Sequence, residues 1–96
     1  MQIVIDGNSI RSESDLHDAL QRHLDFGPHY GRNLNALWDV LSTDIPRPLT
    51  IVWKDAAQSR KALGRHFDNI VHVLSQLSNA ETGLPNDARF ELILEE

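Results

Sequence analysis

The sequence predicts an α/β protein in which a three-stranded parallel sheet is packed by about four helices. Three runs rich in β-branched and other apolar residues, near the start, middle and end of the chain, have the composition of strands. Two stretches with apolar residues at helical spacing separate each pair of strands, which gives the order β-α-α-β-α-α-β. Strands separated by helices can run parallel through right-handed crossovers. The length of 96 residues predicts one domain, residues 1–96.

The first strand and the first helix are expected before residue 25. Residues 3–5 read Ile-Val-Ile and are followed by Asp-Gly-Asn, which suits a buried strand and a tight turn. Ser12 and Asp15 have the spacing of a capping box, with Asp in place of the usual Glu. Apolar residues then recur at helical intervals, so a helix is expected from about Glu13 to Leu24.

Residues 30–41 read Tyr-Gly-Arg-Asn-Leu-Asn-Ala-Leu-Trp-Asp-Val-Leu and predict a second helix with two distinct faces. Asn33 can accept hydrogen bonds from the first free amides, so the helix should begin there, with its positive dipole end beside Tyr30. The neighbouring polar face displays a single carboxylate, that of Asp39. The apolar face consists of Leu34, Leu37, Trp38 and Leu41.

The second half of the chain repeats the strand and helix signals. Residues 49–53 predict the second strand, and because both of its faces are apolar, we expect it to be covered on both sides. Asp55 and Gln58 have capping-box spacing and predict a short helix that runs to about residue 63. An apolar stripe predicts a fourth helix from about 65 to 80, and residues 90–94 form the expected last strand.

Composition limits the kinds of partner and the compartment. Asp and Glu number 14 and Lys and Arg number 9, a formal net charge of -5, which argues against direct nucleic-acid binding and favours a basic partner. A mild negative charge that merely keeps the protein soluble is the alternative. Cysteine is absent, which rules out disulfides and thiolate metal sites. The N-terminus lacks the pattern of a signal peptide and no run is long enough to span a membrane, so we expect a cytoplasmic protein.

The segment 30–39 resembles the barstar family of intracellular ribonuclease inhibitors, whose pattern is Tyr-Gly-x-Asn-Leu-Asp-Ala-Leu-Trp-Asp. Weaker matching covers residues 10–17, Pro48-Leu49 and Trp53. The resemblance implies a barstar-like fold with the same element order, no catalysis and no cofactor. It also implies an immunity protein, monomeric when free, that binds a ribonuclease toxin one-to-one and blocks its active site with the second helix and the preceding loop.

The resemblance implies a specific role for Asp39, because the family's acid at this position takes the place of a substrate phosphate among Arg and His side chains. A carboxylate offers two coplanar acceptor oxygens that an Arg fork can meet with two parallel hydrogen bonds. A helix side chain also has little conformational freedom left to lose on binding. The expected partner-binding residues are His29, Tyr30, Gly31, Asn33, Asn35, Ala36, Trp38, Asp39, Thr43 and Gln76. Trp38 is equally compatible with a place in the core.

Three positions depart from the family pattern. His29 stands where the family often has a second Tyr, and Asn35 and Gln76 stand where it has acids. Amides suit hydrogen bonds better than charge pairs, so we expect a different and less basic nuclease. Support from other acids, such as Asp44 or Glu81, is the alternative. The loop 81–89, longer than in the prototype, is the natural place for partner-specific variation.

The five histidines do not form a recognisable site. His17 with His23 and His66 with His72 lack the i, i+4 spacing of paired helix ligands, so no metal is expected and the histidines should lie on the surface or on helix flanks. His29 is the exception, because an interface histidine would make binding depend on pH near neutrality.

Two other functions compete with inhibition. A small enzyme that uses Asp39 with a histidine as an acid-base pair is disfavoured, since no nucleophile motif or phosphate-binding glycine loop is present. A barstar-fold adaptor or regulator of a non-nuclease protein stays open, because the three departures remove family contacts.

Overall fold

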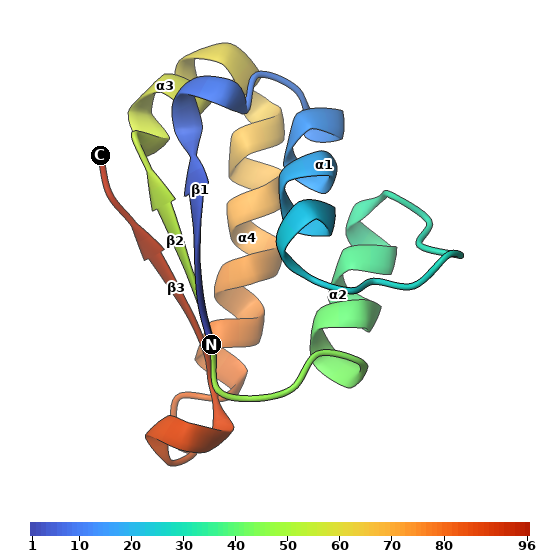
Figure 1. The fold of residues 1–96 in the computed structure, drawn as a ribbon. Helices are drawn as coiled ribbons and strands as arrows, with labels where there is room; N and C mark the ends of the chain where they lie inside the picture. The colour runs from blue at the N-terminus through green and yellow to red at the C-terminus, as the bar shows by residue number, and fades with distance from the viewer.

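The computed structural model describes all residues, 1–96, and contains a three-stranded parallel sheet packed by helices (Figure 1). The predicted order β-α-α-β-α-α-β and the barstar-like α/β architecture are confirmed. The strands are β1 (Gln2–Asp6), β2 (Leu49–Lys54) and β3 (Phe90–Leu94), side by side in that order. The α-helices are α1 (Glu13–His23), α2 (Leu34–Thr43), α3 (Ala56–Leu63) and α4 (Arg65–Ala80), with short 3-10 helices η1 (Gly7–Ser9) and η2 (Asn86–Ala88).

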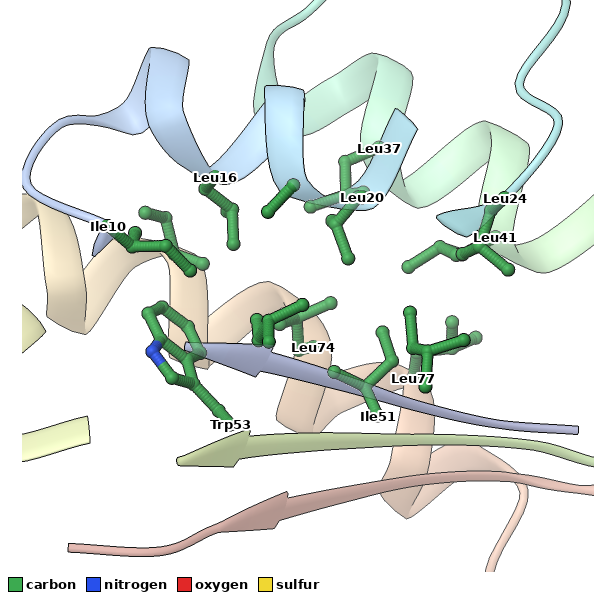
Figure 2. Close-up of a cluster of buried hydrophobic side chains, with 14 of the residues drawn as sticks. Ile10, Leu16, Leu20, Leu24, Leu37, Leu41, Ile51, Trp53, Leu74 and Leu77 are labelled. Atoms are coloured by element: carbon green, nitrogen blue, oxygen red, sulfur yellow. The ribbon is translucent and has the colours of Figure 1, made fainter. Parts of the chain in front are cut away.

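One face of the sheet forms the floor of the hydrophobic core. The parallel register places Ile5, Trp53 and Leu94 in one row across the three strands. Figure 2 shows α1, α2 and α4 on the same side of the sheet, with their leucines pointing toward the strands. Burial of this much apolar surface is the main force that holds the helices on the sheet. No helix is both long enough and apolar enough to cross a membrane.

The opposite face of the sheet is open, which corrects two expectations. Val4 is 42% exposed, although residues 3–5 were expected to form a buried strand. No second layer covers β2, which was expected to be covered on both sides. Val52 is only 5% exposed yet lies outside the core cluster, because Val4 and Ile93 pair with it on either side. The apolar residue on the outer face of β2 is therefore sheltered by its neighbouring strands.

Two helices start at the predicted caps. The Oγ of Ser12 accepts a hydrogen bond from the backbone N–H of Asp15 at 3.1 Å, and Oδ1 of Asn33 accepts one from Ala36 at 2.8 Å. The Asp15 carboxylate accepts from the backbone N–H of Arg11 at 3.0 Å, one residue before the usual capping-box partner. Each such cap stabilises its helix by about 1 kcal/mol. Asn33 thereby sets where α2 begins.

The capping box expected at Asp55 and Gln58 is wrong. Asp55 has a φ of 52°, in the left-handed region, and its side chain makes no capping hydrogen bond. Its carboxylate instead accepts from the side-chain amide of Asn8 at 3.0 Å. This turn also packs against Gly7 so closely that a Cβ there would lie 2.2 Å from the carbonyl oxygen of Asp55. Close packing of two backbone segments therefore sets the geometry before α3.

Candidate functional site

A groove of about 380 Å³ lies between α2 and the loop that precedes it. Residues 26–31 form the loop side, and Ala36, Asp39, Val40 and Asp44 form the helix side. In Figure 1 the loop leaves the end of α1, projects outward and returns to the start of α2. The groove therefore has a loop on one side and a regular helix on the other.

The groove brings together half of the residues expected from the sequence. The expected residues that line it are His29, Tyr30, Gly31, Ala36 and Asp39. The lining that was not among the ten expected contacts consists of Phe26, Gly27, Pro28, Val40 and Asp44. Asp44 had been considered only as possible support. The groove thus contains a second acid that the family pattern does not indicate.

The other five expected residues lie outside the groove lining. Asn33 is the N-cap of α2, and Asn35 is exposed in the first turn of that helix. Trp38 is half-buried and packs against the core cluster. Thr43 is exposed and donates a hydrogen bond from its hydroxyl to a backbone carbonyl one turn earlier at 2.6 Å. Gln76 is exposed on α4.

The two acids of the groove have oxygens free to bind a ligand. Asp39 is exposed in the middle of α2, and its carboxylate takes part in none of the ion pairs or side-chain hydrogen bonds of the chain. Asp44 is exposed at the end of α2 and accepts from the Thr43 hydroxyl at 3.1 Å. An anionic hollow with a partly apolar wall is suited to a guanidinium or imidazolium group.

Tyr30 anchors the loop side of the groove. Its ring packs against Phe26 with the ring centroids 4.7 Å apart, and its hydroxyl lies 2.6 Å from Nδ1 of His17. Burial raises the pKa of the Tyr30 phenol well above its ordinary range, with a smaller opposing effect from the charge of Arg32. The phenol therefore stays protonated and can donate a hydrogen bond to the imidazole.

His17 is buried, which corrects the expectation of surface histidines. It is 1% exposed, and its Nε2 lies 3.1 Å from the carboxylate of Glu13, one turn earlier on α1. Because an ionised carboxylate only accepts hydrogen bonds, Nε2 carries a proton in this pair, and Nδ1 is left to bond the Tyr30 hydroxyl. This tautomer is assigned from the hydrogen-bond network. The network joins α1 directly to the groove.

The comparison with known protein families decides the classification. A sequence model of the family described as "Barstar (barnase inhibitor)" matches residues 1–93. This chain belongs to the barstar family. A Bacillus subtilis (strain 168) protein named "Putative ribonuclease inhibitor YrdF" is 38% identical over 94 residues, which cover 98% of this chain and 98% of that protein. The family assigned from residues 30–39 is confirmed, and the match includes the whole groove.

In this barstar-family chain, Glu81 belongs to the fold and offers no free oxygen to a partner. Arg47 donates to both Glu81 carboxylate oxygens at 2.8 Å, and the backbone N–H of Phe90 donates to one of them at 2.8 Å. These hydrogen bonds, chiefly those from Arg47, hold the pKa of Glu81 below its usual range despite the opposing effect of burial. These internal contacts disfavour Glu81, relative to Asp44, as an acid that supports binding in place of the missing ones.

Sequence reasoning missed two residues that hold the loop of the barstar-family site, His17 and Arg32. The i, i+4 spacing of Glu13 and His17 on α1 was a usable signal for one contact. The contact of His17 with Tyr30 spans 13 residues across a loop, so no local pattern indicates it.

No group of three or more His, Asp or Glu side chains lies close enough together to hold a metal ion.

Proposed function

We propose that this barstar-family protein is an intracellular inhibitor of a ribonuclease, an immunity protein against a ribonuclease toxin. In this proposal α2 and the loop 27–33 block the active site of the enzyme. The observation that carries it is the Asp39 carboxylate, exposed on a groove wall without an internal partner. Family membership supports the proposal, as does the B. subtilis relative, which carries the name "Putative ribonuclease inhibitor YrdF".

The chemistry of Asp39 suits the replacement of an RNA phosphate. An enzyme that binds RNA phosphates presents cationic side chains to them. A carboxylate can take two parallel hydrogen bonds from one guanidinium, and exclusion of water in the complex strengthens them. Asp39 lies on a regular helix whose backbone changes little on association, so the entropy lost on binding is small.

The surrounding groups define the class of nuclease. Tyr30, Gly31 and Ala36 form a groove wall with little charge beside Asp39 and Asp44. In our proposal the partner places one cationic side chain in this groove and meets neutral amides at Asn35 and Gln76, outside it. Such a nuclease presents fewer cations to α2 and α4 than barnase does. We further propose that the complex is one-to-one, that the free protein is a monomer and that no cofactor takes part.

Inhibition of RNA hydrolysis tests the proposal. The protein is titrated against barnase and against any ribonuclease-like toxin encoded by the neighbouring reading frame, and loss of activity should end at one equivalent. Asp39→Asn should weaken inhibition by about 2 kcal/mol or more, a range for which the barnase–barstar pair is itself a source. The matched control is Asp68→Asn, which removes the same charge from an exposed position on α4 and should have little effect.

Two outcomes would contradict parts of the proposal. Full inhibition by Asp39→Asn would move the binding surface away from the groove. Barnase inhibition as tight and as salt-dependent as that by the prototype would contradict the less basic partner. Absence of any nuclease binding, together with Asp39-dependent capture of another protein, would support the adaptor function instead.

A further inference from the structure

Arg32 has an unusual conformation and an unusual set of contacts. It lies two residues before α2 with a φ of 55°, in the left-handed region that non-glycine residues seldom occupy. Its Nη2 donates to the Asp18 carboxylate at 2.8 Å, and to the hydroxyl and carbonyl oxygens of Ser14 at 3.0 and 3.2 Å. Its Nη1 donates to the side-chain carbonyl of Gln21. The guanidinium therefore has four acceptors, all on α1.

The acceptors form one continuous stripe. Ser14, Asp18 and Gln21 are spaced i, i+4 and i+7, so they lie on one face of α1. On the other side of the same loop, Tyr30 points inward to His17 of α1. The chain is thus attached to α1 at residues 30 and 32, on either side of Gly31, which lines the groove.

We propose that Ser14, Asp18 and Gln21 are positioning residues for inhibition. They hold Arg32, and through it the Tyr30–Gly31 wall of the groove, in the binding conformation before the partner arrives. This inference rests on the proposed function. Ordering a loop in advance lowers the entropy lost on binding, so residues that need not touch the partner can raise affinity.

Charge also favours a supporting role for Arg32 over direct contact. A free guanidinium on this loop would repel the cationic group that the groove is suited to bind. Pairing with Asp18 neutralises Arg32, although both side chains are partly exposed, at 37% and 51%, and the pair is open to screening by salt.

The test separates loop order from charge. Ser14→Ala/Gln21→Ala removes the two neutral side-chain acceptors, keeps the Ser14 carbonyl and changes no charge, and Asp18→Asn removes the ion pair. Arg32→Asn removes the guanidinium but keeps a residue that tolerates the left-handed conformation. Asp68→Asn on α4 is the control for loss of one negative charge. For each full-length protein we measure amide hydrogen exchange at residues 29–33. We also measure the association and dissociation rates with the nuclease that the wild-type protein inhibits.

We expect faster exchange in the loop and about tenfold faster dissociation in all three variants. Stability to urea should stay close to that of the control, and association rates should change no more than the change in net charge explains. Weaker binding by Arg32→Asn alone would make Arg32 a direct contact and overturn the inference. So would faster dissociation without faster loop exchange, because the α1 residues would then touch the partner themselves. Unchanged dissociation in all variants would contradict the positioning role and leave the proposed function intact. Failure of the wild type to bind any nuclease would contradict both the proposed function and this inference.

Discussion

The phenol of Tyr30 and the imidazole of His17 form a hydrogen bond of 2.6 Å between the loop before α2 and the buried face of α1. Tyr30 lines the groove, whereas His17 is buried and bonded to Glu13. A residue of the candidate interface is therefore also part of the fold. We expect substitutions at this position to affect stability and binding together.

Titration of Tyr30 reports on the burial of its phenol. Because the chain contains one tyrosine, the rise in ultraviolet absorbance that accompanies phenolate formation comes from this side chain, on top of the absorbance of the two tryptophans. Burial raises the pKa of the Tyr30 phenol in the folded protein above the ordinary value of 10.0. The protonated phenol therefore contributes its full stabilisation below pH 10.0, and that contribution is lost as the pH rises through the pKa of the folded state. We expect no phenolate in the native protein near pH 10 and alkaline unfolding coupled to ionisation. Reversible native titration near pH 10 would show that the phenol is not buried.

The ion pair of Glu81 with Arg47 should make the free energy of unfolding depend on pH in the acid range. Its lowered pKa means that its stabilisation is present above the ordinary value of about 4.5 and is lost as pH falls through the lower folded value. We expect Glu81→Gln to lower the free energy of unfolding by about 1–3 kcal/mol at pH 7, with a much smaller difference from wild type at pH 3. Urea denaturation at both pH values measures this.

The matched control for that experiment is Glu91→Gln. Glu91 pairs with Arg89 at 2.8 Å, but its side chain is 42% exposed, so the pair should contribute less than about 1 kcal/mol. Equal losses for the two substitutions would show that the Arg47 contact is no stronger than a surface pair.

Gly7 should tolerate no side chain. A Cβ there would lie 2.2 Å from the carbonyl oxygen of Asp55 and 2.4 Å from that of Lys54, both backbone atoms that cannot move independently. Gly7→Ala should therefore lower the free energy of unfolding by about 1–3 kcal/mol or more. Gly83→Ala is the control, because nothing lies within 4 Å of a Cβ at that position. Thermal unfolding of both variants compares them, and equal midpoints would contradict the close packing.

Asp44 should contribute to binding less than Asp39 does. Both acids line the groove, but the Asp44 carboxylate already accepts a hydrogen bond from Thr43. A charge at the rim acts mainly on the association rate and its salt dependence. We expect Asp44→Asn to slow association about two- to tenfold at low salt, with the effect shrinking at high salt. Stopped-flow mixing with the nuclease that the wild-type protein inhibits measures the association rate. A change confined to the dissociation rate would place Asp44 in direct contact with the nuclease instead.

Much of the candidate site was predictable because its signals are local. Asn33 caps α2, Asp39 is exposed on the flank of that helix and Leu37 is buried, as the helical period indicated. The groove itself was not predictable, because it depends on where the loop lies against α2. The same limit applies to Asp44, which follows the last helical residue and whose place in the groove wall no periodicity indicates.

The sequence by itself determined the order of strands and helices, the caps at Ser12 and Asn33, and the family, since each depends on residues a few positions apart. Only the tertiary structure decided that one face of the sheet stays open and that His17 is buried. It also decided that Asp55 bonds Asn8 rather than capping α3, and that Arg32 is held by α1. The partners in these contacts are 13 to 47 residues apart, and distance along the chain carries no signal of which side chains will meet.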